Sequence, residues 1–264
     1  MIKVTRTELR GSEVLHDFDL GFLTPINLGA KQLGKQFLSL LQDHMFDFSP
    51  ERIGNYEPIK LAYNFNEIDA CLDFWENPFL WKRRKPRVLG NVWMSYPNQH
   101  SSVYITANSK QLDPQKIVEF FKATSHLLQV DFAYLHFLAE PESESWDVQQ
   151  KLMPFRQGVT THDLRKNIPN LCWATVFGKP YTRLFLLERI LCAPAPIIQE
   201  IDKDTIYIQL SQDIFDLKSH YESINLVREK VKRHLNCNAF LDTSLPPQHQ
   251  YTIPKFTFDE SVYI

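Results

Sequence analysis

The stretch Ser102-Val-Tyr-Ile-Thr-Ala107 decides the predicted fold, because it begins a series of sequence patterns that recurs later in the chain. A long amphipathic stretch follows it, and then comes Asp131-Phe-Ala-Tyr-Leu135. Thr205-Ile-Tyr-Ile-Gln-Leu210 is likewise followed by an amphipathic stretch and then by Cys237-Asn-Ala-Phe-Leu241. Alternating apolar residues are typical of strands, and apolar residues three or four apart are typical of helices. Each succession therefore predicts a strand, a helix and a closing strand.

The first unit also has a strand before this succession. Residues 88–96 alternate, and Pro97-Asn-Gln-His100 has the composition of a hairpin turn. Asp113-Pro114 is a typical helix start, because Asp accepts bonds from free amides and Pro suits the first turn. The pattern predicts a helix over 115–129 and a strand over 131–138.

The second unit begins with an aromatic-bearing strand over 171–177, and Gly178-Lys-Pro180 is a predicted turn. Residues 181–186 could pair back as a strand. A strand over 205–210, a helix over 219–235 and a closing strand over 237–241 complete the unit. The likeness of the two units is explained either by internal duplication or by coincidence of a common motif.

These elements predict an α+β fold in which two similar strand-strand-helix-strand units form a mixed β-sheet with helices packed on one side. The polar stretch from Glu140 to Ser145 marks a seam between an N-terminal half, 1–145, and a C-terminal half, 146–264. The chain could also form one compact domain.

Composition excludes several classes of protein. Of the 264 residues, 44% are hydrophobic and 13% aromatic, which is too apolar for a disordered chain. Only 8 Gly are present, whereas loops that cradle phosphates need Gly. The net charge of -2 gives no general attraction for nucleic acid or anionic lipid.

The cysteines and the N-terminus indicate a cytoplasmic protein. Cys71, Cys172, Cys192 and Cys237 lack metal-ligand or redox spacing, so we expect buried free thiols in a reducing compartment. The N-terminus lacks an apolar signal core, and no apolar run reaches the length of about 20 residues that a membrane helix needs.

Residues that could perform catalysis or bind metal are scattered. A serine nucleophile elbow is missing, and Cys172 and Cys192 lie in apolar surroundings. His126 and His136 flank Asp131 without the three- or four-residue spacing of helical metal ligands, so structural roles are favoured. We therefore predict no catalytic residue, no metal site and no cofactor.

Two charged segments are candidate contact sites for a partner. Glu140, Glu142 and Glu144 precede Trp146 and could present an acidic face to a basic partner, with the Trp as an anchor. The alternative is a solvated linker. The basic run from Lys82 to Arg87 could bind phosphates, but a solvated loop is favoured because nucleic-acid proteins carry a broader basic surface.

The stretch Ile168-Pro-Asn-Leu-Cys-Trp-Ala-Thr-Val-Phe-Gly-Lys-Pro-Tyr181 resembles a pattern of bacterial immunity proteins of polymorphic toxin and type VI secretion systems. Glu188–Pro194 and Pro50–Ile53 are similar to other parts of the same group. The resemblance implies a protein that neutralises a cognate toxin by binding it, and it carries over no catalytic residue.

Three hypotheses follow. The first is an immunity protein whose partner is a cognate toxin, with the seam from Glu140 to Trp146 as one contact. The second is a hydrolase or nuclease that uses His136, Glu140 or His162-Asp163 in a cleft between the halves. The third is a nucleic-acid-associated accessory protein that acts through Lys82 to Arg87.

Overall fold

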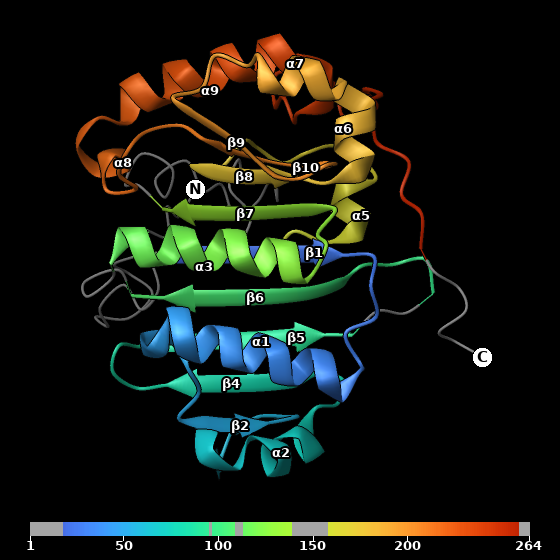
Figure 1. The fold of residues 1–264 in the computed structure, drawn as a ribbon. Coiled ribbons are helices and arrows are strands. Elements are labelled where there is room, and N and C mark those ends of the chain that lie inside the picture. The colour runs from blue at the N-terminus through green and yellow to red at the C-terminus, as the bar shows by residue number, and fades with distance from the viewer. Residues whose placement is uncertain (1–17, 95–96, 109–112, 139–157, 259–264) are drawn as a thin grey trace, which may run out of the picture.

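The strands of the protein form one ten-stranded sheet. The computed structural model describes residues 18–94, 97–108, 113–138 and 158–258 (Figure 1). The strand order is β3-β2-β4-β5-β6-β1-β7-β8-β10-β9, and each neighbouring pair is antiparallel. The predicted α+β class is confirmed.

Strands and helices are interspersed along the chain. The strands are β1 (Phe18–Thr24), β2 (Arg52–Gly54), β3 (Leu61–Ala62), β4 (Phe79–Arg83), β5 (Val88–Trp93), β6 (Ser101–Ala107), β7 (Phe132–Phe137), β8 (Ala174–Phe177), β9 (Ile197–Asp202) and β10 (Thr205–Gln209). The α-helices are α1 (Lys31–His44), α2 (Ile68–Cys71), α3 (Pro114–Leu127), α5 (Thr161–Leu164), α6 (Lys179–Phe185), α7 (Leu187–Leu191), α8 (Asp216–Ser219) and α9 (Tyr221–Leu235). Short 3₁₀ turns occupy Phe46–Phe48, Phe65–Glu67, Leu72–Phe74 and Cys237–Ala239.

Helices α1 and α3 cover one face of the sheet, and the two helices pack against each other (Figure 1). On this face Phe22 of β1 lies 5.4 Å from the ring of Phe121 in α3. Phe37 of α1 lies 6.0 Å from the ring of Trp81 in β4. Burial of these large rings is the main source of stability for the face.

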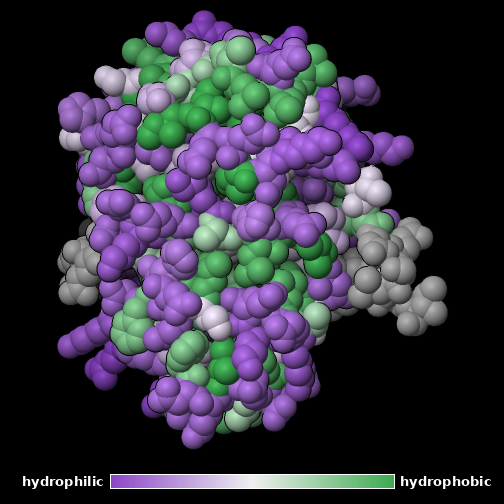
Figure 2. Space-filling model, viewed as in Figure 1, coloured by the Kyte–Doolittle hydropathy of each residue, from purple (hydrophilic) through white to green (hydrophobic). Residues whose placement is uncertain are grey.

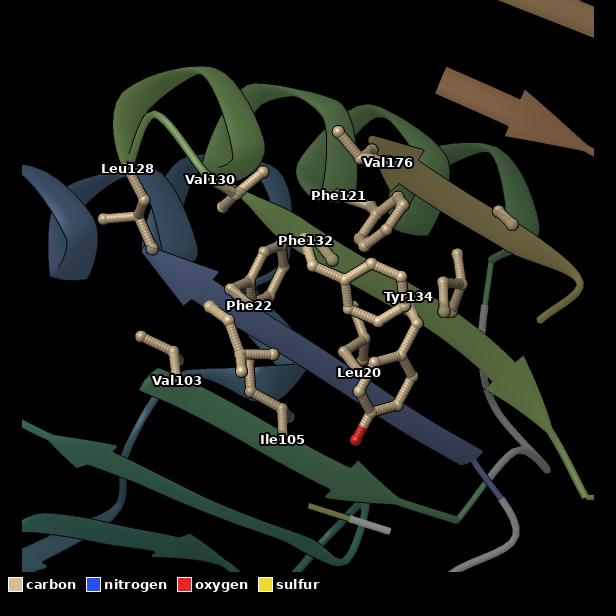
Figure 3. Packing of buried hydrophobic residues seen from close by; sticks show 14 of the residues in the cluster. Leu20, Phe22, Val103, Ile105, Phe121, Leu128, Val130, Phe132, Tyr134 and Val176 are labelled. Carbon is tan, nitrogen blue, oxygen red and sulfur yellow. The ribbon is translucent and has the colours of Figure 1, made fainter. Parts of the chain in front are cut away.

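The opposite face is covered by a different part of the chain. Phe132 and Tyr134 of β7 point to this side, because alternate residues of a strand face opposite ways (Figure 3). Tyr181 of α6 packs on Phe132 at 5.6 Å and on Phe177 of β8 at 5.3 Å. Helices α1 and α3 therefore cover one side as expected, and α6 adds a helix on the other side.

The first predicted unit is confirmed in order and position. β5 and β6 form the expected hairpin, α3 follows, and β7 returns to the sheet. Asp113 caps α3 through its side chain, which accepts from the amides of Gln115 and Lys116, and Pro114 begins the helix. β6 and β7 lie on either side of β1, so α3 crosses over one strand.

The second predicted unit is partly wrong. Residues 181–186 do not pair back as a strand, because the chain from Lys179 to Phe185 forms α6 with Pro180 in its first turn. The closing strand over 237–241 is also wrong, since Cys237–Ala239 is a 3₁₀ turn and only Phe240 bridges to Ile168. The β9–β10 hairpin was not predicted. The two units therefore differ in structure.

Strands from both sides of the predicted seam belong to the same sheet. β7, which precedes the seam, pairs with β8, which follows it, over four residue pairs from Phe132↔Phe177 to Leu135↔Ala174. The division into 1–145 and 146–264 stays a prediction.

The stretch Ile168–Tyr181, on which the family resemblance depends, forms β8 and the start of α6. Trp173, Phe177 and Tyr181 are all buried in the core. Gly178 joins the strand to the helix, and a Cβ at this position would overlap the carbonyl oxygen of Val130. The aromatic pattern therefore describes how β8 and α6 pack on β7.

Candidate functional site

The predicted seam contact falls outside the described residues. Glu140, Glu142, Glu144 and Trp146 all lie within 139–157. Their role in binding a partner stays a prediction.

The candidate catalytic residues within the described chain do not converge. His136 is buried in β7, where its Nδ1 accepts a bond of 3.2 Å from the amide of Trp173. His126 lies at the surface, with its Nδ1 2.8 Å from the Asp202 carboxylate. Asp163 and Thr160 form the capping box of α5, and His162 beside them is exposed. These groups therefore occupy separate places instead of one cleft.

A polar cluster that the sequence did not predict joins three distant segments. His100 precedes β6, Asp131 precedes β7 and Thr161 begins α5. The His100 Nε2 lies 3.1 Å from Asp131 Oδ2, and its Nδ1 lies 2.9 Å from Thr161 Oγ1. The amide of His100 also donates to Thr161 Oγ1 at 2.9 Å. With hydrogen on Nε2, the imidazole donates to the carboxylate and accepts from the hydroxyl.

The order hydroxyl, imidazole, carboxylate is that of a nucleophilic triad, but this cluster is enclosed. The His100 side chain is only 1% exposed and that of Asp131 only 8%. The edges of the Phe256 and Phe258 rings pack on the imidazole at centroid distances of 4.7 and 4.9 Å. Burial raises the pKa of Asp131, and the bond from His100 opposes this rise. We assign the cluster a structural role, because these rings occupy the space that a substrate would need.

A second buried cluster lies on the side of β1 that faces away from α3. The Tyr134 hydroxyl donates to Asp19 Oδ2 at 3.2 Å and accepts from the amide of Gly158 at 3.1 Å. The other oxygen, Oδ1, has no hydrogen-bond partner within the described part of the chain. Burial raises the pKa of Asp19 to about 8, so the carboxyl group is mostly protonated at pH 7.

The basic run from Lys82 to Arg87 forms the end of β4 and the turn into β5. The Arg83 guanidinium donates to the carbonyls of Ser49 and Lys85 and stacks 5.0 Å from the Phe46 ring. Lys82 and Arg83 are neighbours in a strand, so they point to opposite faces. The run therefore does not form a single basic patch.

Two of the four cysteines differ from their prediction. Cys71 is buried and Cys172 half-buried, whereas Cys192 and Cys237 are exposed. Cys192 follows α7 and Cys237 begins the 3₁₀ turn after α9, and both elements lie at the surface. All four are free thiols, as expected.

A cleft of about 490 Å³ lies between α3 and the β9–β10 hairpin. Tyr207 and Gln209 form its floor, and Lys122 of α3 lies over the Tyr207 ring at 5.6 Å. The Gln209 amide already donates to the carbonyls of Ser211 and Gln212. Figure 2 shows this side of the molecule, where polar side chains surround apolar ones. Asp113, Glu119 and Asp213 also line the cleft, so together with Lys122 its lining includes charged groups of both signs.

Within residues 18–94, 97–108, 113–138 and 158–258, His, Cys, Asp and Glu side chains nowhere gather in threes that could hold a metal ion. Among the same residues, no helix combines the length and apolar character that crossing a bilayer requires.

Comparison with known proteins shows a similar fold among solved structures. No protein-family model matches the chain, and no curated protein does. The structure of the Pseudomonas aeruginosa T6SS protein PA0821 superposes with a TM-score of 0.50 at 14% sequence identity. The match covers 91% of this chain and 79% of that chain. At this level of identity, the likeness shows a shared fold.

Proposed function

We propose that this protein acts in a type VI secretion system (T6SS), as an immunity protein that binds and neutralises a cognate toxin. The shared fold with the T6SS protein PA0821 carries the proposal, since it extends over 91% of the chain. The packing motif of β8 and α6 supports the finer assignment, because it is the stretch that resembles immunity proteins.

The chemistry of the described residues is compatible with a role in binding. The enclosed His100 cluster stabilises the fold, and the remaining candidate catalytic groups lie apart. An inhibitor needs a rigid scaffold and a complementary surface. The sheet and its helices provide such a scaffold.

We expect a gene next to the one for this protein to encode the cognate toxin, and the test uses the toxin domain of that gene product. We expect bacteria that express this domain to grow only when this protein is co-expressed, and we expect the two purified proteins to form a complex. Growth arrest despite co-expression, together with no complex at micromolar concentrations, would contradict the proposal.

The same assay tests the seam contact. The double substitution Glu142→Lys and Glu144→Lys is expected to slow association with the toxin domain, because charge reversal turns attraction to a basic partner into repulsion. The control is Glu200→Lys with Glu222→Lys, which makes the same change at two exposed sites on β9 and α9. Equal association rates for both double variants would show that the seam is not a contact.

A further inference from the structure

One side of the strands β2, β4 and β5 exposes large apolar side chains. α1 packs on the other side, where Phe37 contacts Trp81 of β4. Burial alternates strictly along β5, with Val88 and Val92 buried towards α1. Leu89 and Trp93 point away from α1 and are 38% and 46% exposed. A half-exposed Trp at the end of a strand loses much of the stabilisation that burial would give.

The strand pairing shows which residues lie beside Trp93 and Leu89. Leu80 of β4 pairs with Asn91, so it lies diagonally between the two exposed side chains of β5. Lys82 pairs with Leu89, and Arg52 of β2 pairs with Lys82. We call these residues the open face: Arg52, Leu80, Lys82, Leu89, Asn91 and Trp93.

The open face ends where the chain folds over β6. Tyr104 of β6 pairs with Asn91 and points to the same side. Its hydroxyl donates to the carbonyl of Val159 at 2.5 Å, so the segment before α5 lies over β6. Beyond β6 this side of the sheet is buried at β1 and β7, as Asp19 and Tyr134 show. The open face therefore ends at β6.

The charges of the open face have one sign. Arg52 and Lys82 are its ionisable residues, and the positions of β2, β4 and β5 on this side include no Asp or Glu. Arg84, Lys85 and Arg87 in the adjoining turn add positive charge beside it. Apolar side chains with cations at one end are complementary to an apolar patch that has carboxylates beside it.

We propose that the open face binds an acidic surface of the T6SS toxin, with Trp93 as the main anchor. The inference rests on the proposed function and adds the site and the charge of the partner. Trp is enriched among the few interface residues that dominate affinity, and cations at the rim speed the capture of an acidic partner. A protein partner fits better than single-stranded nucleic acid, because Leu80 and Leu89 offer no ring on which bases stack.

The experiment measures binding of the purified toxin domain from the neighbouring gene to the full chain. Trp93→Glu is expected to weaken affinity about thirty-fold or more, since it removes the anchor and adds a repelling charge. Trp93→Lys also removes the anchor but keeps the positive sign, so its loss is expected to be smaller. Arg52→Glu with Lys82→Glu is expected to lower the association rate and its dependence on salt.

The matched control is Leu226→Glu, because Leu226 of α9 is 62% exposed and lies far from the open face in the sequence. It is compared with Leu89→Glu, which is expected to weaken binding while the control does not. Circular dichroism and the denaturant midpoint of each variant establish that it is folded. A variant with wild-type spectra and reduced affinity therefore reports on the contact itself.

The possible outcomes separate the two proposals. A wild-type complex that Trp93→Glu and Leu89→Glu leave unchanged overturns the open face but not the proposed function. Failure of the wild type to bind the toxin domain contradicts both. Self-association of the chain that Trp93→Glu abolishes would assign the face to a second copy. Binding of a single-stranded RNA oligonucleotide that Trp93→Glu abolishes would assign it to nucleic acid, and either result overturns the inference.

Discussion

Among single residues, Asp19 shows how burial changes the chemistry of a carboxyl group. It lies in β1 at 4% exposure, and its pKa is raised to about 8 by burial, with the Tyr134 hydroxyl opposing the rise. In the unfolded chain the pKa of Asp is about 3.9. Between these two values the folded protein holds a proton that the unfolded chain has lost.

The sign of the resulting pH dependence follows from this difference. The stabilisation from the neutral carboxyl is fully present below about pH 4 and is lost as the pH rises through about 8. We expect Asp19→Asn to flatten the fall in the free energy of unfolding between pH 5 and pH 8, measured by urea denaturation. Asp131, whose pKa is also raised by burial, leaves part of the slope in place.

The control for this prediction is Asp43→Asn, because Asp43 is exposed at the end of α1. It is expected to leave the pH profile as in the wild type. The prediction fails if wild type and Asp19→Asn lose the same stability between pH 5 and pH 8.

At the scale of elements, Gly90 makes room in β5 for a side chain of the paired strand β4. Trp81 of β4 pairs with Gly90, and a Cβ at this position would overlap the Trp81 ring. The ring cannot swing away freely, because its Nε1 donates to the carbonyl of Phe48 at 3.1 Å. The glycine therefore lets the Trp81 ring lie between β5 and Phe37 of α1.

We expect Gly90→Ala to lower the free energy of unfolding by about 1–3 kcal/mol, the usual cost of overpacking a core. The control is Gly54→Ala in β2, where an added Cβ would meet its nearest atom, the carbonyl oxygen of Tyr56, at 3.6 Å. Chemical denaturation compares the two variants. Equal changes in stability at both positions would contradict the role assigned to Gly90.

Elements with a strong local pattern could be predicted from the sequence. The β5–β6 hairpin, α3 and β7 lie within a few residues of their predicted bounds, because hydrophobic periodicity and the Asp113-Pro114 cap both indicate them. The strand predicted over 181–186 failed because Pro180 suits the first turn of a helix as well as a turn. The closing strand over 237–241 failed because the Asn236 side chain accepts from the amide of Asn238 and favours a tight turn.

The clusters of the candidate site could not be predicted, since sequence order does not show which distant segments meet. His100, Asp131 and Thr161 come together only because β1 brings the starts of β6 and β7 to the same end of the sheet. The alternation along β5 indicates that its two sides differ, but which side is exposed depends on the position of α1.

At the scale of the whole molecule, the sheet continues across the predicted seam. β7 and β8 pair directly, and the bonds between His100 and Thr161 also join the two halves. Separating the halves would leave an unpaired edge on both strands. We therefore expect the halves to unfold together.

Differential scanning calorimetry of the full chain tests this expectation. A single transition is expected, with the calorimetric enthalpy equal to the van't Hoff enthalpy. Two separate transitions would instead support 1–145 and 146–264 as independent domains.

The central place of β1 has a consequence for biosynthesis. This strand is translated well before its two partners, β6 and β7. One of its edges stays open until Ala107 has emerged, and the other until Phe137 has emerged. A hydrophobic strand whose edges stay unpaired during translation is a site for chaperone binding. Slowing translation before β6 is therefore expected to reduce the yield of folded protein.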